Sequence, residues 1–424
     1  MSRTFSAWVT SGADFLGVTG PFPVDVPWWA EVEPVVERLE HILGVPVFVL
    51  RLLEVDGGES GCDGHVTYHV EASGRPRARS LRQHPVDQGM LWTEDALRSP
   101  WARADGPTGR RADGLRELLD WATRALAAQG RPVLGPAEQR RTWNLAGLFR
   151  LPTARGPVWL KATPPFASDE AAVIAAFAGV DTGLVPTVLA VGERRVLLEH
   201  IPGEDCWTAD DATVAAGVRR FVAAQAALAG RRPPGLRDRR DRFLGDLVRE
   251  LLDGRVELGL TDEERDRARE LTHRWDRLAA CGLPDTLVHA DFHPGNWRSD
   301  GRPPVVVDFA DSHWGNPVLD CLRLHDFLPE AVRPTAVRVW ADARRTRVPA
   351  GDPVRALALA EPLAHLSYAL RYQEFLDGIE PSERPYHQGD PTSVIRRALR
   401  CAAHPSPDFV RAADRRGRAG EPFA

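Results

Sequence analysis

The 424-residue chain lacks several features that would assign it to a class at once. Its formal net charge is −5, so it has no basic surplus of the kind that nucleic-acid-binding proteins carry. No apolar run approaches the roughly 18 residues that a membrane helix needs. The five cysteines are scattered without a C-x-x-C pair, which argues against a disulfide framework or a zinc site. The N-terminal residues lack the apolar core of a signal peptide. We therefore expect a cytoplasmic protein that binds neither nucleic acid nor membranes.

Lysine is almost absent. Of the 54 Lys and Arg residues, only Lys161 is a lysine. A codon bias toward arginine explains the surface but not the one exception. The lysine ammonium is a compact point charge, and a nucleotide-phosphate site can require one. Lys161 lies in Gly-Pro-Val-Trp-Leu-Lys-Ala, a pattern typical of a strand. A leftover surface lysine is the alternative interpretation.

The apolar pattern divides the chain into three ranges. Residues 1–130 predict a small α+β domain, with helices at 28–43 and 115–129, strands at 45–55 and 65–70, and a linker at 101–114. Residues 131–202 predict one helix at 168–178 and five strands, at 141–145, 148–152, 158–163, 185–191 and 195–200. Residues 203–424 are mostly helical, with predicted helices at 210–229, 241–253, 261–280, 317–328, 331–345, 353–376 and 391–402, and a tail from 404 that we expect to fray. In the first range His65, His69 and Glu71 could bind a metal, but a partly exposed sheet face is the simpler interpretation.

The most informative stretch interrupts the helices at residues 287–311. It contains Asp291, then Asn296 five residues later, then Asp308 at the end of an apolar run. A carboxylate can orient a hydroxyl, while an amide and a second carboxylate can hold Mg²⁺ on a nucleotide phosphate. Phosphoryl transfer asks a protein for little beyond such positioning and charge compensation. Turn-forming roles for all three residues are the alternative.

Several motifs in this region resemble those of one known family. His-Ala-Asp-Phe-His-Pro-Gly-Asn at 289–296 resembles the H-G-D-x-H-P-G-N signature of the aminoglycoside phosphotransferase and choline kinase family. Val-Val-Asp at 306–308 resembles its metal-binding I-D, and Gly-Asn-Pro-Val-Leu-Asp at 315–320 resembles its G-D-P-x-x-D. The resemblance covers roughly residues 136–400. It implies an α+β fold of the two-lobed protein-kinase-like type, with a small β-rich N-lobe at 131–202 and a large helical C-lobe at 203–424. The small α+β domain of residues 1–130 precedes them.

The resemblance also implies roles for individual residues. Asp291 would accept a hydrogen bond from the acceptor hydroxyl, and Asn296 and Asp308 would ligate Mg²⁺. The ATP-binding residues would be Lys161 at the phosphates, Glu170 as its helix partner, Glu199 and Ile201 in a hinge at 197–203 that holds the adenine, and Gly147 in the loop covering the phosphates.

The residues around the loop have supporting roles in this picture. His289 would pack under the catalytic loop, and Asp320 would brace its backbone from a helix start. His293 would either approach the transferred phosphate or pack. Asp311 is interpreted as a solvated turn residue.

Three departures from the family pattern affect the expected activity. The loop at 143–149 has a single glycine, so close backbone approach to the phosphates is less assured. Ala290 replaces the usual glycine between His and Asp, and Asn316 replaces the usual aspartate of G-D-P. ATP use is still expected, but efficient catalysis is less secure.

The sequence therefore predicts an ATP- and Mg²⁺-dependent phosphotransferase acting on a hydroxyl of a small molecule. Acidic and aromatic residues at 204–211 and 377–383 would suit a cationic acceptor, although helix capping or simple solvation also explains them. One alternative is a peptide or protein Ser/Thr kinase docked by the N-terminal domain. Another is a non-catalytic nucleotide-binding module. The sequence indicates neither the acceptor nor the oligomeric state.

Overall fold

The computed structural model describes residues 3–12, 14–25, 28–57, 64–77, 80–85, 111–254 and 256–409. The chain divides into two compact units. The first unit comprises Met1–Ala167, Val188–His200 and Glu374–Gln388, and the second comprises Ser168–Thr187, Ile201–Gln373 and Gly389–Ala424. One division falls between His200 and Ile201, inside the segment identified as a hinge. Most of the predicted linker and tail lie outside the described residues.

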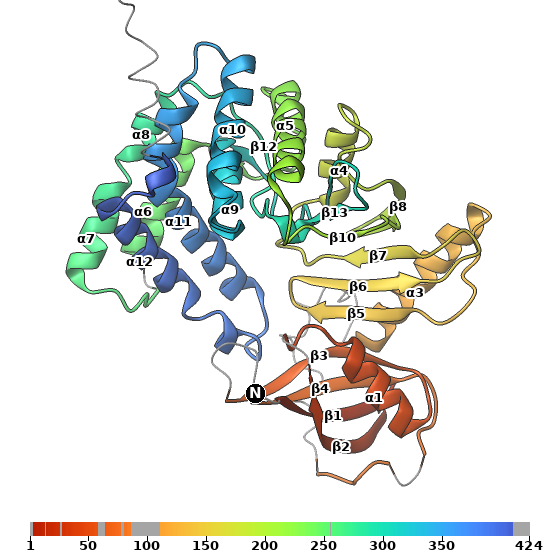
Figure 1. Cartoon of the computed structure of the whole chain (residues 1–424). Coiled ribbons are helices and arrows are strands. Elements are labelled where there is room, and N and C mark those ends of the chain that lie inside the picture. The colour runs from red at the N-terminus through yellow and green to blue at the C-terminus, as the bar shows by residue number, and fades with distance from the viewer. Residues whose placement is uncertain are drawn as a thin grey trace, which may run out of the picture. The chain divides into compact units, whose positions relative to one another are not determined.

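The first unit contains a four-stranded sheet with the order β2-β1-β4-β3 (Figure 1). Its strands are β1 (Arg3–Ser11), β2 (Asp14–Val24), β3 (Val47–Asp56) and β4 (His65–Ala72). The sequence pattern missed β1 and β2. The predicted helix at 28–43 is shorter than expected: α1 spans Glu33–Leu43, with a proline in its first turn and Gly44 in a left-handed conformation after its end.

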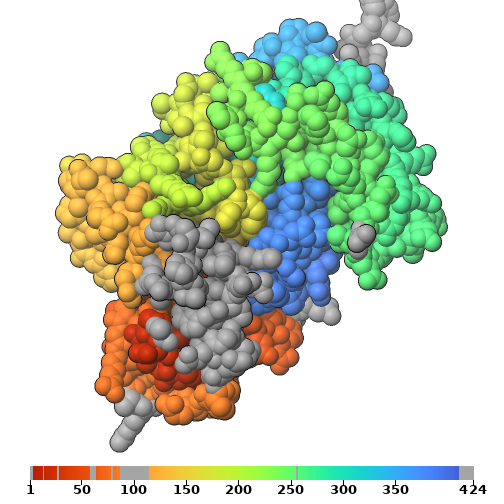
Figure 2. Space-filling model, turned by 180° about the vertical axis from the view of Figure 1, so that it is seen from behind, coloured from red at the N-terminus to blue at the C-terminus, as the bar shows by residue number. Residues whose placement is uncertain are grey.

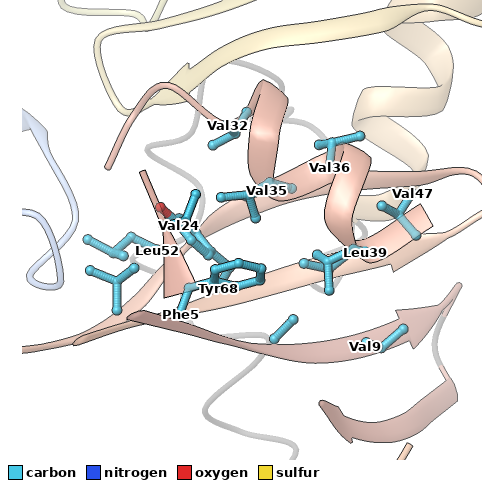
Figure 3. Close-up of a cluster of buried hydrophobic side chains, with 14 of the residues drawn as sticks. Phe5, Val9, Val24, Val32, Val35, Val36, Leu39, Val47, Leu52 and Tyr68 are labelled. Carbon is cyan, nitrogen blue, oxygen red and sulfur yellow. The ribbon is translucent and has the colours of Figure 1, made fainter. Parts of the chain in front are cut away.

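Helix α1 covers one face of this sheet. Val35, Val36 and Leu39 point from α1 toward Phe5 of β1 and Tyr68 of β4 (Figure 3). Their spacing places them on one side of the helix. Burying each such aliphatic side chain stabilises the fold by about 1.5–3 kcal/mol relative to leaving it exposed. This packing gives the N-terminal sheet a core of its own.

The candidate metal ligands of β4 are packed against β1. Thr10 Oγ1 lies 3.0 Å from Nε2 of His69 and donates to Oε2 of Glu71, while Thr4 Oγ1 lies 2.9 Å from Nδ1 of His65. His69 and Glu71 are buried, so the expectation of a partly exposed sheet face is wrong for them. Among the described residues, no three His, Cys, Asp or Glu side chains form a group that could hold a metal.

A five-stranded antiparallel sheet follows in the first unit, with the order β5-β6-β7-β9-β8. This confirms the predicted set of five strands. Their bounds are β5 (Glu138–Trp143), β6 (Ala146–Leu151), β7 (Val158–Ala162), β8 (Val188–Gly192) and β9 (Arg195–Glu199). Helix α3 (Arg111–Ala128) packs on the sheet through a core that includes Leu118, Leu126, Phe149 and Leu160.

The second unit is mainly helical, as predicted. Its helices are α4 (Glu170–Ala178), α5 (Asp211–Leu228), α6 (Asp241–Asp253), α7 (Asp262–Leu271), α8 (Arg274–Ala279), α9 (Val318–Phe327), α10 (Arg333–Arg347), α11 (Pro353–Gly378) and α12 (Asp390–Ala403). The last residues of α11 fall in the first unit. Its short strands are β10 (Glu204–Asp205), β11 (Asp238–Arg239), β12 (Thr286–Val288), β13 (Trp297–Ser299), β14 (Val305–Val306) and β15 (His313–Gly315).

Two details refine the helix predictions. The range 261–280 forms two helices, α7 and α8, and Thr261 with Glu264 makes the predicted capping box at the start of α7. Arg396 of α12 donates to Glu264 and so joins α12 to α7. In Figure 2 the blue surface of the late helices lies beside the green surface of the helices that precede them in the chain. Within the described part of the chain, no helix has the length and apolar character that crossing a bilayer requires.

Candidate active site

The loop between β12 and β13 is braced from beneath by two buried side chains. Asp320, in the first turn of α9, accepts hydrogen bonds from the backbone N–H groups of His289 (3.0 Å) and Ala290 (2.9 Å). Nδ1 of His289 accepts from the N–H of Asp291 at 3.2 Å, so the ring proton lies on Nε2, which donates to the carbonyl of Val307 at 2.9 Å. Both side chains are buried, and these contacts agree with the bracing roles expected for them.

Ala290 stands in a conformation that favours glycine. Its φ is 71°, in the left-handed region, where a side chain other than glycine costs about 1–3 kcal/mol. This strain explains why the resembling signature has glycine here. The hydrogen bond to Asp320 and the neighbouring contacts hold the loop in place despite the strain. Asp308 also has a positive φ, of 66°.

Asp291 is held as a carboxylate by its neighbours. Its Oδ1 accepts hydrogen bonds from Nε (2.8 Å) and Nη2 (2.7 Å) of Arg323, and its Oδ2 accepts from Nδ2 of Asn296 at 3.0 Å. Burial opposes the charge, but the charge of Arg323 and the hydrogen bonds from His293 and Arg323 outweigh it and hold the pKa of Asp291 well below its usual range. The side chain keeps 26% of its surface exposed, so a hydroxyl can reach it.

Arg323 was not identified from the sequence. It follows Asp320 by three residues on α9, and this spacing places the two side chains on one face of the helix. Its guanidinium lies over the rings of Phe327 and Tyr368, with 4.4 and 4.8 Å to the ring centroids. The i, i+3 spacing to Asp320 was the only signal that could have revealed it.

His293, in the loop between β12 and β13, stacks between two exposed aromatic rings. Its Nδ1 accepts from the N–H of Gly295 at 3.1 Å, so Nε2 carries the proton and faces Oδ2 of Asp291 at 3.3 Å. The ring stacks on Trp207 (centroids 5.1 Å apart) and on Phe327 (4.7 Å). Trp207 and Phe327 are 43% and 38% exposed. His293 therefore links Asp291 to a solvent-facing aromatic surface, which we call the aromatic platform.

Asn296 and Asp308 lie next to each other across a hairpin. Strand β13 pairs antiparallel with β14, and the N–H of Val307 extends the ladder by donating to the carbonyl of Asn296 at 2.8 Å. The amide nitrogen of Asn296 donates to the carbonyl of Asp291 at 2.9 Å and to its carboxylate. Within the described part of the chain, no hydrogen bond is made to the amide oxygen of Asn296. One carboxylate and one amide oxygen fit Mg²⁺, which is held by few protein oxygens together with water and substrate phosphates.

Glu170 is attached to the same hairpin. It is buried in the first turn of α4, and its Oε1 accepts from the N–H of Phe309, the residue after Asp308, at 3.0 Å. The N–H of Ser168 donates to the carbonyl of Ala310 at 2.8 Å. Glu170, predicted as the partner of the nucleotide lysine, thus also fixes the backbone beside Asp308.

The remaining predicted nucleotide residues lie at or beside the five-stranded sheet. Lys161 is buried in β7, opposite Leu148 of β6 and Val196 of β9. The carboxylate of Glu199 receives two hydrogen bonds from Arg131, at 2.7 and 2.9 Å, so its side chain is engaged at the end of β9. Gly147 lies in β6 opposite Thr142, and the turn itself is Asn144-Leu145. Ile201 is the first residue of the Ile201–Gln373 segment of the second unit.

Several acidic residues that the sequence suggested for acceptor recognition or solvation are engaged in contacts within the protein or are buried. Asp210 caps α5 by accepting from the N–H of Thr213 at 2.8 Å. Glu380 and Glu383 are fully buried, so 377–383 does not present the acidic surface considered from the sequence. Asp311 lies in a turn and is partly exposed, as expected, but its carboxylate also accepts from Nε of Arg371 at 3.1 Å, so it is held by an ion pair as well as by solvent.

Comparisons with known proteins bear on the family and the fold of the chain. Residues 149–357 match the model of the phosphotransferase enzyme family. The family resemblance seen in the motifs is therefore supported over this stretch of the chain. No curated protein matches the sequence. A choline/ethanolamine kinase family protein from Mesorhizobium loti superposes with a TM-score of 0.50 at 20% identity, covering 70% of this chain and 97% of that one. The predicted protein-kinase-like α+β fold is therefore confirmed.

Two further solved structures are similar to this chain. A protein from Thermobifida fusca that is described as a fructosamine-3-kinase is 19% identical, with a TM-score of 0.46. The match covers 66% of this chain and 98% of that one. A macrolide 2′-phosphotransferase from Brachybacterium faecium is 20% identical over 64% and 98%, with a TM-score of 0.43. Because both scores lie below 0.5, the fold assignment is drawn from the Mesorhizobium structure alone.

Proposed function

We propose that this phosphotransferase moves the γ-phosphate of ATP, with Mg²⁺, to a hydroxyl of a small molecule. The observation that carries the proposal is the environment of Asp291. Arg323, His293 and Asn296 hold it as an aligned carboxylate, and the pKa of Asp291 stays well below its usual range. Such a carboxylate is a weak base. Its role is therefore to accept a hydrogen bond from the acceptor hydroxyl and to aim that oxygen, with the proton leaving late.

The donor side rests on residues already described. Asn296 and Asp308 would hold the metal through oxygen, and Lys161 would bind the nucleotide phosphates. When bound, Mg²⁺ neutralises charge on the transferred phosphate. Glu170 and Val307 keep the backbone around Asp308 in its left-handed conformation, so the carboxylate is positioned before the nucleotide arrives.

The aromatic platform supports an acceptor with a flat face. Trp207 and Phe327 are exposed, lie 6.0 Å apart between ring centroids and flank His293 beside Asp291. A sugar or other ring could stack there and direct a hydroxyl at Oδ2. Glu204 and Asp205, which are exposed and precede Trp207, would also suit a cationic group on that ring.

An acceptor screen with γ-labelled ATP tests the proposal. The screen covers amino alcohols, aminoglycosides, neutral sugars and Ser/Thr peptides, each with and without Mg²⁺. We expect label transfer to a small molecule, and Asp291→Asn should reduce kcat by about 100-fold or more while Mg·ATP still binds. Asp300→Asn, in the β13–β14 turn of the same hairpin, is the matched control and should retain activity. Transfer to peptides alone, or nucleotide binding without any transfer, would contradict a small-molecule phosphotransferase.

A further inference from the structure

The turn between β5 and β6 lies close in register to the nucleotide lysine. Trp143 pairs with Ala146 across a two-residue turn formed by Asn144 and Leu145. On the neighbouring strand, Lys161 is opposite Leu148 of β6. In kinases the loop between the first two strands covers the phosphates that a lysine on the third strand contacts. The Asn144-Leu145 turn occupies that place in the sheet order of this unit.

This turn is anchored by a segment from far along the chain. The backbone N–H of Asn144 donates to both carboxylate oxygens of Glu383, at 2.9 and 3.0 Å, and its Nδ2 donates to Oε1 at 2.7 Å. The amide oxygen of Asn144 accepts from the N–H of Glu380 at 2.6 Å. Asn144 is only 2% exposed. These hydrogen bonds hold the turn in one conformation.

The anchoring segment is in turn fixed by the N-terminal sheet. Glu380 accepts from Nη1 of Arg51 in β3 at 2.5 Å, and both side chains are buried. Tyr386 stacks on Trp29 with ring centroids 5.6 Å apart and packs against the core of Figure 3. The N-terminal sheet therefore determines where Glu380 and Glu383 stand. Arg51 and Trp29 thus connect the N-terminal sheet and its flanking segment to the residues that anchor the turn.

A second connection reaches the other end of β5. Nε2 of Gln139 donates to the carbonyl of Val49, and the N–H of Val49 donates to Oε1 of Gln139, at 2.7 and 2.8 Å. Gln139 is buried and lies five residues before Asn144. It joins β5 to the N-terminal sheet without contacting the turn, which makes it a suitable control.

The surroundings of Glu383 disfavour a charge on its carboxyl group. Burial, with Glu380 nearby, raises the pKa of Glu383 well above its usual value. A neutral carboxyl or an amide in this place can accept from Asn144 without the cost of a buried charge. Removing the acceptor altogether would leave two buried N–H donors of Asn144 unsatisfied.

We infer that Glu383 is a positioning residue: through Asn144 it holds the β5–β6 turn in the conformation that meets the donor phosphates, and the N-terminal sheet holds Glu383. The inference rests on the proposed nucleotide-dependent function. The N-terminal sheet thus acts as a brace on nucleotide binding.

The test is the affinity for Mg²⁺ with a non-hydrolysable ATP analogue, measured by calorimetry. Without the contact between Asn144 and Glu383, we expect the β5–β6 turn to adopt its binding conformation about a tenth of the time. Asn144→Ala and Glu383→Ala should then each weaken binding of the analogue about tenfold. In the double variant the two losses should not add, because both remove one contact. Glu383→Gln should restore affinity to within about threefold of wild type, since an amide oxygen still accepts.

Two controls separate positioning from general loss of structure. Gln139→Ala should lower the melting temperature and leave the affinity unchanged. Amide hydrogen exchange at Asn144 and Leu145 should accelerate in Glu383→Ala and stay slow in Gln139→Ala. If Glu383→Ala does not fold, Asn144→Ala and Glu383→Gln still decide the question by affinity.

The outcomes also distinguish this inference from the proposed function. Wild-type affinity in folded Asn144→Ala and Glu383→Ala, together with lost affinity in Asp308→Ala, overturns the inference and leaves the function standing. If wild type does not bind the Mg²⁺–analogue complex, or Asp308→Ala binds it equally well, the proposed function fails, and the inference with it. If Gln139→Ala loses as much affinity as Glu383→Ala, Glu383 has no specific positioning role and the inference is overturned.

Discussion

Arg323 and Asp291 form a two-pronged contact in which Nε and Nη2 of the guanidinium both donate to Oδ1 of the carboxylate, at 2.8 and 2.7 Å. The contact leaves Oδ2 to Asn296, His293 and an incoming hydroxyl. Arg323 is itself enclosed by Phe327 and Tyr368. Because the arginine is fixed, it orients Asp291 as well as compensating its charge. This relationship makes Asp291 a weak base in a fixed orientation.

Replacing Arg323 should therefore change the pH dependence of activity. Burial raises the pKa of Asp291 and Arg323 lowers it, so Arg323→Gln should raise that pKa. Catalysis requires the carboxylate form, so the acid limb of the kcat/KM profile should move to higher pH. Arg323→Lys keeps the charge without the fork and should show a smaller displacement. The measurement is a pH–rate profile from about pH 4 to 9. An acid limb that stays in place in Arg323→Gln would show that Arg323 does not control the charge of Asp291.

Asp241 should make the protein less stable as the pH rises toward neutrality. It is buried at the start of α6, where it accepts from Nδ2 of Asn316 at 3.0 Å. Burial raises its pKa to about 7. The folded state therefore holds this proton more tightly than the unfolded chain, whose aspartates titrate at about 3.9. Stability should fall as the pH rises from about 4 to about 7 and then level off.

Asp241→Asn provides the check on this expectation. The amide keeps the shape and can still accept from Asn316, but it does not ionise. The variant should melt at a higher temperature than wild type at pH 8 and at a similar temperature at pH 4. Melting curves across this range are sufficient. A constant difference between the two proteins at every pH would mean that ionisation of Asp241 is not the cause.

Gly295 should be intolerant of a side chain because of Trp207. A Cβ at position 295 would lie 2.3 Å from Cζ2 of Trp207 and 3.0 Å from Cε1 of His293. Gly295→Ala must displace the tryptophan from its stack on His293, which disturbs the ring beside Asp291. We expect kcat/KM for the acceptor to drop about tenfold, a cost of about 1.4 kcal/mol.

The tryptophan can be removed to test this cause. In a Trp207→Ala background the clash with the indole disappears, so Gly295→Ala should have a much smaller further effect. The two losses should therefore be non-additive. The measurement is steady-state kinetics on the four members of the cycle. Fully additive losses would indicate that Gly295 acts on the loop independently of Trp207.

Local sequence signals predicted most of the helices and strands. The five strands between Glu138 and Glu199 and most of the helices after Asp210 were predicted, and their bounds agree with the structure within a few residues. Strands β1 and β2 were missed. Their pairing contains register shifts, and β2 contains Gly17 and Gly20 with two prolines, which break the alternation used to recognise a strand.

In the candidate site, too, contacts between residues close in sequence could be predicted, whereas contacts between distant residues could not. Asp291 and Asn296 are joined by contacts within a six-residue loop, which a motif can encode. Arg323, Trp207 and Glu383 make their contacts with residues that are 32, 86 and 239 positions away, at Asp291, His293 and Asn144. Contacts at such separations depend on how strands and helices pack. A single sequence carries no direct signal for them.

The sequence by itself determined the chemistry offered by the loop and hairpin at 289–308 and the single lysine suited to nucleotide phosphates, because these depend on residue type and on short spacings. Only the tertiary structure decided how these groups are held. Folding places Arg323 against Asp291, brings Trp207 and Phe327 around His293, and buries Glu383 against Asn144. The physical reason is that charge compensation and burial act through space, and the neighbours that provide them lie far apart along the chain.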